Sequence, residues 1–484
     1  MKLGDAVTLM NAMLSGSNEQ FLEAEFKRVS IDSRQTQPGD LFFAFSQPDY
    51  QGNCFNGDFP DSTVYVPAAF EQGALAAVVR PDRFEEHRLI LEPFVDKLIF
   101  VQDAIYALQL LAKGVYEQWA KPVVGITGSA GKTTAKEITS SLLKHSGRAV
   151  LSNEKNYNNN IGHPLTVLKL LSDSSYEVAV LEMAMSTPHK EISRLCKITP
   201  PDVAVVLNVL PVHIEHLGSI ENIAKAKAEI VEGMKEGGTA VLNADDFRVS
   251  DMSKLSKGSV ITFGINNRAD IMAFDIEPSG FDETIFKLRT PNDEALISLS
   301  LAGKHNVMNA LAASAVGFVF GMTAQEIAQA LSNIKPPPQR GEILKFKNGL
   351  AVINDSYNSN PDALISMVKT MIENASPGER KIVVAGEMLE LGDLAEQMHY
   401  ETGRNIAQMG IDLLIGVRGF ASQMVRGAKE AGLDQAIFIE DSDKAAEFLL
   451  DEIKTGDLVL IKGSRGVRME KIVEKFLEKF RLES

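Results

Sequence analysis

The stretch GSAGKTT, residues 128–134, has the residue types of a phosphate-binding loop. It lies between an apolar run, VVGIT (123–127), and a helical pattern, TAKEITSSLLKHSG (134–147). The usual loop reads G-x-x-x-x-G-K-[ST]. This chain reads G-x-x-G-K-T instead, with Ile126 where the first glycine is expected. The spacing alone therefore leaves two interpretations, a shortened phosphate loop or a plain glycine-rich turn.

The context of the loop favours phosphate binding. A strand, a glycine-rich turn and a helix start aim backbone N–H groups at an anion, and the helix dipole adds favourable potential. Lys132 would neutralise the outer phosphates, and the Thr133 hydroxyl would ligate Mg²⁺.

Three further residues have suitable chemistry for such a site. Glu182 closes the apolar run EVAVLEMAM, where a carboxylate is costly unless it is solvated, paired or metal-bound. His213 follows LNVL, and Lys227 belongs to the helical pattern after it. The alternatives are a strand-end acid for Glu182 and a solvated surface for His213 and Lys227.

Polar residues also interrupt three other stretches. These are LNADD (242–246), GKHNVMNALAA (303–313) and NDSYNSNPDAL (354–364). Each has a purely structural interpretation as a turn or a capped helix start. Their order along the chain is more informative than any one of them.

Apolar runs alternate with helical patterns and must position these residues. Near-continuous Val/Ile/Leu runs of this kind predict parallel sheets that are buried on both faces. Ligands bind at the carboxyl ends of such strands, where Glu182, Asn208 and Asn243 fall. The predicted strands lie within 40–45, 74–79, 98–101, 123–127, 177–185, 202–210, 239–246, 350–357, 381–388, 412–418, 436–441 and 457–464.

Two breaks divide the 484 residues into three predicted domains. A helical pattern over 103–119 ends before the first break, and the prolines of KPPPQRGE (335–342) mark the second because they favour a stiff extended segment. We expect an α/β protein: a smaller N-terminal α/β domain, a central P-loop-type parallel-sheet ATPase domain and a C-terminal Rossmann-like open α/β domain. Their predicted ranges are 1–117, 118–334 and 335–484.

Composition excludes several classes of protein. The net charge of −15 argues against coating nucleic acid, which requires a basic surface. Two cysteines, Cys54 and Cys196, are too few for a disulfide framework. No leader-like N-terminus and no run of about 18 apolar residues is found, so we expect a cytoplasmic protein with no membrane span.

Taken together, the motifs resemble those of the Mur ligases, ATP-dependent enzymes of bacterial cell-wall synthesis. The shortened loop is similar to the family's own nucleotide loop, and the resemblance extends over almost the whole chain. The stretches that carry it, besides LNADD, are NYNNNIGHPLTVLKL (156–170), DSYNSNP (355–361), GEMLELG (386–392) and VLIKGSRGVRME (459–470).

The resemblance implies amide formation by a monomer. ATP phosphorylates the terminal carboxylate of a UDP-N-acetylmuramoyl-tripeptide, and the amine of D-alanyl-D-alanine attacks the acyl phosphate. Two Mg²⁺ ions are implied as cofactors.

The resemblance also assigns roles to individual residues. Lys132, Glu182, His213 and Lys227 would be catalytic; Thr133, Glu182, His213 and Lys227 would hold metal, with Lys227 carbamylated. ATP would contact Gly128, Ser129, Ala130, Gly131, Lys132, Thr133, Thr134, Asn309, Arg340 and Asp355. Ser33, Arg34, Asn156, Asn160 and Asn358 would bind substrate.

The sequence departs from the family pattern at a few places, and other functions stay open. The segment 51–70 has extra residues, and Glu387 stands where aspartate is more usual. One alternative is the family's ligase that adds the third amino acid, although the Asp-Asn-Pro-Arg motif of its diaminopimelate-using form is absent. Another is a P-loop nucleotide switch, whose N-K-x-D motif is also absent.

Overall fold

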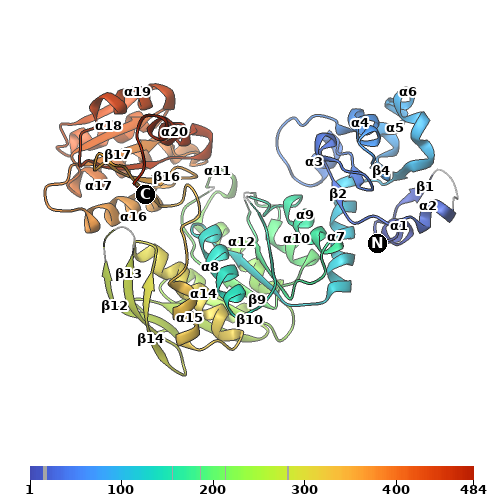
Figure 1. Cartoon of the computed structure of the whole chain (residues 1–484), viewed down its shortest axis with the longest axis horizontal. Helices are drawn as coiled ribbons and strands as arrows, with labels where there is room; N and C mark the ends of the chain where they lie inside the picture. The colour runs from blue at the N-terminus through green and yellow to red at the C-terminus, as the bar shows by residue number, and fades with distance from the viewer. Residues whose placement is uncertain are drawn as a thin grey trace. The chain divides into compact units, whose positions relative to one another are not determined.

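The computed structural model describes residues 1–14, 19–154, 156–185, 187–212, 214–278, 280 and 283–483. Its strands form a five-stranded, a nine-stranded and a six-stranded sheet (Figure 1). Residues 1–126, 147–204 and 229–238 make one compact unit, and residues 127–146, 205–228 and 239–484 make the other. In the part of the chain described, no helix is long and apolar enough to cross a membrane.

The first sheet has the order β1-β5-β4-β3-β2, in which only β1 runs antiparallel to its neighbour. Its strands are β1 (Met13–Leu14), β2 (Val29–Ser30), β3 (Leu41–Phe43), β4 (Ala76–Val79) and β5 (Leu98–Phe100). The helices of this region are α1 (Leu3–Leu9), α2 (Glu19–Glu23), α3 (Gln47–Gly52), α4 (Val66–Glu71), α5 (Pro81–Glu86), α6 (Arg88–Leu91) and α7 (Ala104–Trp119).

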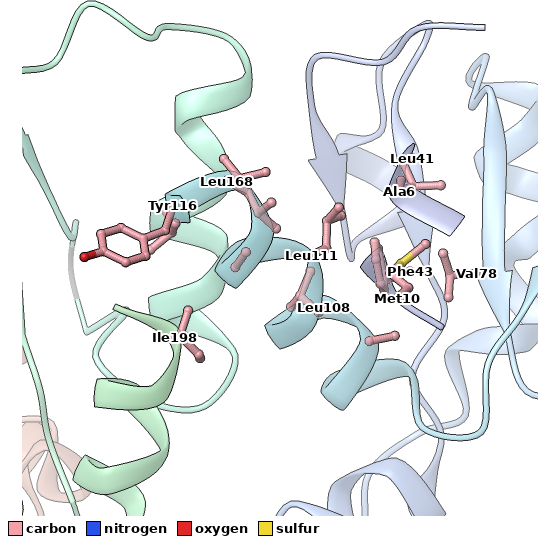
Figure 2. Close-up of a cluster of buried hydrophobic side chains, with 14 of the residues drawn as sticks. Ala6, Met10, Leu41, Phe43, Val78, Leu108, Leu111, Tyr116, Leu168 and Ile198 are labelled. Atoms are coloured by element: carbon pink, nitrogen blue, oxygen red, sulfur yellow. The ribbon is translucent and has the colours of Figure 1, made fainter. Parts of the chain in front are cut away.

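Helix α7 connects this sheet to the rest of its unit. It begins where the Asp103 side chain accepts a hydrogen bond from the Tyr106 N–H, as an N-cap should. Along the helix, Leu108 and Leu111 belong to the same buried cluster as Met10 and Leu168 (Figure 2). One continuous core therefore extends past residue 117, and the predicted boundary there falls within the last turn of α7.

The second sheet has the order β14-β13-β12-β11-β10-β9-β6-β8-β7. Its strands are β6 (Val123–Thr127), β7 (Val150–Ser152), β8 (Val178–Glu182), β9 (Val203–Val206), β10 (Thr239–Asn243), β11 (Ser259–Gly264), β12 (Ile271–Pro278), β13 (Thr284–Arg289) and β14 (Glu294–Leu299). The helices are α8 (Lys132–His145), α9 (Gly162–Val167), α10 (Glu191–Ile198), α11 (Ile214–Leu217), α12 (Ile220–Glu232), α13 (Phe247–Asp251), α14 (Lys304–Val319) and α15 (Ala324–Leu331).

One edge of this sheet differs from the expected parallel arrangement. Strands β10 to β12 pair in parallel, whereas β12, β13 and β14 pair antiparallel. The sequence analysis assigned no strand between residues 247 and 302. Antiparallel strands need bury only one face, so their residues alternate instead of forming continuous apolar runs.

The third sheet, drawn in orange and red in Figure 1, has the order β15-β16-β20-β17-β18-β19. Its strands are β15 (Glu342–Lys345), β16 (Ala351–Asp355), β17 (Lys381–Gly386), β18 (Leu413–Val417), β19 (Ala436–Ile439) and β20 (Leu458–Lys462). The helices are α16 (Pro361–Asn374), α17 (Ala395–Gln408), α18 (Ala421–Glu430), α19 (Ser442–Glu452) and α20 (Glu470–Lys479).

Both faces of this third sheet are buried. Along β20, Leu458 and Leu460 pack with α16, α17 and α18, while Val459 and Ile461 pack with α19 and α20. An open sheet with helices on both faces confirms the predicted Rossmann-like fold. Every strand predicted from an apolar run is also present. The predicted domain limits themselves stay predictions.

Candidate active site

The loop between β6 and α8 has the backbone geometry that the sequence pattern predicts. Gly131 precedes α8 with φ of +84°, a left-handed conformation that favours glycine. A Cβ atom at this position would lie 2.3 Å from Oδ1 of Asn309. Gly131 therefore permits both the turn and the close approach of Asn309 to the loop.

Asn208, directly after β9, braces the loop. Its Oδ1 accepts from the Ala130 N–H at 2.9 Å, its Nδ2 donates to the Ala130 carbonyl, and its own carbonyl accepts from the Ser129 N–H. The Ser129 hydroxyl bonds the backbone of Leu210. The sequence placed Asn208 at a strand end, and the structure shows that its partner is the loop.

The ammonium group of Lys132 is hydrogen-bonded to carbonyls of the loop. Its Nζ donates to the Gly128 carbonyl at 2.9 Å and lies 3.4 Å from that of Ser129. Thr133 follows in the first turn of α8, partly exposed, and Thr134 is buried. The N-terminal turn of α8 thus combines a fixed cation, a hydroxyl and backbone donors, which suits a phosphate chain.

Glu182 ends β8, with Ile126 of β6 opposite in the register. It is a strand-end acid, as one interpretation held, but its exposure is 3%, so it is not solvated. Asn153 exchanges two hydrogen bonds with the Glu182 backbone, and Nδ2 of Asn158 donates to Oε1 at 2.7 Å. These roles of Asn153 and Asn158 were not predicted from the sequence, although Asn158 lies in the stretch 156–170.

The residue types are those that bind Mg²⁺. Mg²⁺ is typically held by one or two carboxylates together with substrate phosphates and water, and the Glu182 carboxylate and the Thr133 hydroxyl are each an oxygen donor of that kind. No group of three or more His, Cys, Asp or Glu side chains suited to a metal occurs among the described residues. A metal held entirely by protein side chains is therefore not seen within that part of the chain.

Lys227, on α12, is buried with 2% exposure, so the predicted alternative of a solvated surface is wrong. Burial lowers the pKa of Lys227 well below its usual range, and the positive charge of Lys132 lowers it further. Over the described residues, Lys227 has no ion pair or side-chain hydrogen bond. Such an amine is chemically unusual, since buried lysines are rarely unpaired. His213 lies outside the described residues.

A pocket of about 450 Å³ joins two of the polar stretches noted in the sequence, LNADD and GKHNVMNALAA. It is lined by Asn208, Val209, Leu210, Asn243, Asp245, Asp246, Phe247, Arg248, Ile265, Asn266, Lys304, His305 and Met308. Asp246 accepts from the Val209 N–H at 2.7 Å and caps α13. The pocket lies at the carboxyl ends of β9 and β10, where α/β sheets bind ligands.

Asp355, at the end of β16, forms an ion pair with Lys462 of β20 at 2.5 Å. Lys462 also donates to the carbonyl of Asn358, whose side chain is exposed. Burial lowers the pKa of His305 to about 4; Asp355 opposes this shift, and Lys462 adds to it. The Arg340 guanidinium lies over the Tyr357 ring at 4.0 Å.

The stretch GEMLELG forms a braced loop after β17. Nε2 of His399 accepts from the Met388 N–H at 2.8 Å, and its Nδ1 donates to the Ala395 carbonyl. Oε1 of Glu387 accepts from the Phe420 N–H. His399 was not predicted from the sequence because Met388 is eleven residues away, beyond the spacing of one helical turn.

The predicted substrate residues near the N-terminus are not brought to the loop by any described contact. Arg34 is bound to Asp32, and this pairing lowers the pKa of Asp32 to about 2. Ser33 opens the same 3₁₀ turn. Asn156 is exposed, whereas Asn160 is buried and its carbonyl accepts from Gln109.

The unusual segment 51–70 folds against an aromatic cluster. Tyr50 stacks on Phe59 with ring centroids 4.0 Å apart, and Phe55 meets both rings edge-on. Arg194 of α10 lies 3.5 Å from the Cys54 sulfur. The extra residues are therefore packed into the unit, which the sequence did not predict.

Comparisons with known proteins agree with this geometry. A family model described as the Mur ligase middle domain matches residues 126–317, and one described as the Mur ligase glutamate ligase domain matches residues 339–465. The UDP-N-acetylmuramoyl-tripeptide–D-alanyl-D-alanine ligase of Bacillus subtilis is 33% identical over 466 residues, covering 96% of this chain and 95% of the relative.

Solved structures are similar over the whole length. A crystal structure of MurF from Acinetobacter baumannii has a TM-score of 0.85 at 27% identity, covering 99% of this chain and 98% of the other. MurF from Thermotoga maritima in complex with ADP has a TM-score of 0.79 at 28% identity, covering 96% and 99%.

Proposed function

Because the chain belongs to the Mur ligase family, we propose that it joins D-alanyl-D-alanine to a UDP-N-acetylmuramoyl-tripeptide at the expense of ATP. It is an ADP-forming ligase of peptidoglycan precursor synthesis. The observation that carries the proposal is the 128–134 loop, braced by Asn208 and approached by Asn309 at the N-terminus of α8.

The reaction proceeds in two displacements. The tripeptide carboxylate attacks the γ-phosphorus of ATP, the bond to the bridging oxygen breaks, and ADP leaves. The deprotonated amine of the dipeptide then attacks the acyl carbon, the C–O bond breaks, and inorganic phosphate leaves. A carboxylate is a poor electrophile, so phosphorylation supplies the leaving group, and the protein contributes positioning and charge stabilisation.

The loop N–H groups and Lys132 bind the transferred phosphoryl group in this proposal. Thr133 and Glu182 would hold one Mg²⁺, which when bound neutralises phosphate charge. Asn158 holds the Glu182 carboxylate, and a ligand orientated in this way loses little freedom on binding metal.

Lys227 is proposed to be carbamylated and to serve, together with His213, near a second Mg²⁺. The support is chemical. A buried amine beside the ammonium of Lys132 is unfavourable as a cation. Carbamylation converts it into an anion, which is attracted to Lys132 and to divalent metal.

Nucleotide and substrate contacts complete the proposal. The pocket lined by Asn243 and His305, at the end of β10, is large enough to accept the adenine base of ATP. Asn309, Arg340 and Asp355 are proposed as ATP contacts. For substrate binding, the proposed residues are Ser33, Arg34, Asn156, Asn160 and Asn358, with Asp32 orientating Arg34.

The enzyme is proposed to act as a monomer in the cytoplasm, where ATP is available. A phosphate-release assay tests the function. D-Alanyl-D-alanine, L-lysine and diaminopimelate are each supplied with the matching UDP-muramoyl acceptor. ATP-dependent release with the dipeptide alone supports the proposal. Release only with L-lysine or diaminopimelate would identify the enzyme that adds the third residue, and ATP hydrolysis independent of every acceptor would indicate a nucleotide switch.

A further inference from the structure

The Tyr357 ring is contacted by guanidinium groups from two separate segments of the chain. Arg340 precedes β15 and lies 4.0 Å from the ring centroid, and Arg465 follows β20 at 5.7 Å. Arginine stacks on aromatic faces because the ring quadrupole attracts the cation, and stacking keeps the guanidinium plane fixed. Tyr357 therefore acts as a platform for two cations.

The loops that present this platform are tied together. Asp355 and Lys462 stand opposite each other in the register of β16 and β20, and they form an ion pair. Lys462 also donates to the carbonyl of Asn358 at 2.9 Å. The positions of Tyr357 and Arg465 are thus set by the carboxyl ends of two neighbouring parallel strands, where open α/β sheets bind ligands.

Among the described residues, no carboxylate balances the charge of the platform. Within the described residues, neither Arg340 nor Arg465 forms an ion pair with a carboxylate. Exposed arginines are often solvated, but two on one ring repel each other, and an anion placed against them would remove that cost. This arrangement lies in a chain whose net charge is −15, so it is a local exception.

The proposed reaction supplies an anion that has no other partner. D-Alanyl-D-alanine carries a terminal carboxylate that takes no part in the chemistry. Binding it would orientate the attacking amine and would distinguish a free dipeptide from a longer peptide. A guanidinium matches a carboxylate with two parallel hydrogen bonds, and such charge-assisted bonds are the stronger kind.

We infer that Arg465, held against Tyr357, binds the carboxylate of the incoming dipeptide and sets specificity for it. Arg340 is assigned to the nucleotide above, and Arg465 has no role there. The inference rests on the proposed function. Tyr357 acts through Arg465 and is a positioning residue.

The test compares D-alanyl-D-alanine with D-alanyl-D-alaninamide, which has no carboxylate, in phosphate-release kinetics. Wild-type enzyme should show a KM for the amide about 10- to 100-fold higher, the range for losing a hydrogen-bonded charge. Arg465→Gln should raise the KM for the dipeptide by a similar factor and leave the KM for the amide unchanged. Arg465→Lys keeps the positive charge but cannot form the two parallel hydrogen bonds of a guanidinium. This variant should discriminate between dipeptide and amide to an intermediate extent.

Controls separate this idea from other sources of the effect. Arg468→Gln removes an exposed arginine of the same segment and should behave as wild type. Tyr357→Phe keeps the ring and should retain discrimination, while Tyr357→Ala should lose part of it. The KM values for ATP and for the UDP-tripeptide should stay within about threefold in Arg465→Gln.

Two results would overturn the inference: wild-type enzyme that uses dipeptide and amide equally, or Arg465→Gln that discriminates between them as wild type does. An Arg465→Gln effect confined to the KM for ATP would transfer the residue to phosphate binding, also against the inference. Absence of phosphate release by wild type with D-alanyl-D-alanine refutes the proposed function instead, so the two failures are distinguishable.

Discussion

Lys227 should form a carbamate at neutral pH because burial keeps its amine uncharged. Only the neutral amine reacts with carbon dioxide. A lysine of ordinary pKa, about 10.4, is neutral in roughly one molecule per thousand at pH 7.4. Each unit by which the pKa falls raises that fraction about tenfold, until the amine is mostly neutral. The pKa of Lys227 is lowered well below the usual range by burial and by Lys132. Lys227 should therefore react up to about a thousandfold more readily than a surface lysine.

The experiment measures carbamate formation while pH is varied, at a fixed concentration of ¹³C-bicarbonate in Mg²⁺-free buffer without nucleotide. A neutral amine and bicarbonate give carbamate and water with no net proton release, so the occupancy of Lys227 should rise less steeply with pH between about pH 7 and 9 than that of a lysine of ordinary pKa. An ammonium must first lose a proton, so surface carbamates should rise about tenfold per pH unit. The ¹³C signal present in wild type and absent in Lys227→Gln reports the site. Lys225→Gln, which removes an exposed lysine of the same helix, is the matched control and should keep the signal.

The same shift has a consequence for stability, with a definite sign. Since the folded-state pKa of Lys227 lies below the unfolded value of 10.5, unfolding of the unmodified protein takes up a proton between these two pKa values. The unfolding free energy should therefore fall as pH drops below 10.5, by at most about 1.4 kcal/mol per pH unit, and Lys227→Gln should lose that dependence.

The carbamate experiment has two outcomes that would refute the reasoning. One is a wild-type carbamate signal that climbs tenfold per unit from pH 7 to 9, and the other is a signal that never appears.

Three further outcomes are expected. Lys132→Ala should reduce phosphate release by roughly 10²- to 10³-fold, the effect of removing one preorganised charge-stabilising donor. Lys144→Ala, which changes an exposed lysine in the last turn of α8, should not reduce it. Equal rates of phosphate release in the two variants would contradict the role of the loop. His399→Gln should lower the free energy of unfolding by about 1–3 kcal/mol, because the buried Met388 N–H loses its side-chain acceptor; an unchanged urea midpoint would show that this hydrogen bond does not stabilise the fold. Burial lowers the pKa of His163 to about 3, so stability should decline as pH falls from 6.5 towards 3, by at most about 1.4 kcal/mol per unit. Urea midpoints followed by the fluorescence of Trp119, the only tryptophan, should show this slope in wild type and a shallower one in His163→Leu; parallel slopes would exclude His163 as the cause.

Most parallel strands were predictable because burial on both faces produces continuous apolar runs, which can be read directly from the sequence. The parallel strands β2, β7 and β11 were missed, since the first two are very short and β11 is largely half-buried. Strands β13 and β14 were missed although a signal existed. Their residues alternate between buried and exposed, as in TIFKLR and EALISL, which is the period of a half-buried antiparallel strand. The search for continuous runs excluded that pattern.

The candidate site was predictable where chemistry and backbone geometry coincide within a short segment, as at Gly131 and Lys132. It was not predictable where the partner is distant along the chain. Asn208 binds a loop 78 residues before it, and Asn158 binds a carboxylate 24 residues after it. Pairs of this kind depend on which strands become neighbours, and a single sequence does not specify that directly.

Charge links these observations. An acidic protein that binds a nucleotide must create positive potential locally, and the proposed sources here are the loop N–H groups, Lys132 and the N-terminus of α8. Adding a second ammonium, Lys227, in the buried surroundings of Lys132 would raise the potential but at a large desolvation cost. A neutral Lys227 would avoid the cost, and the carbamate proposed above would reverse its charge, so that it could balance both Lys132 and a divalent ion. The burial that disfavours the ammonium of Lys227 would therefore suit this residue to the proposed site, which must hold phosphates and metal together.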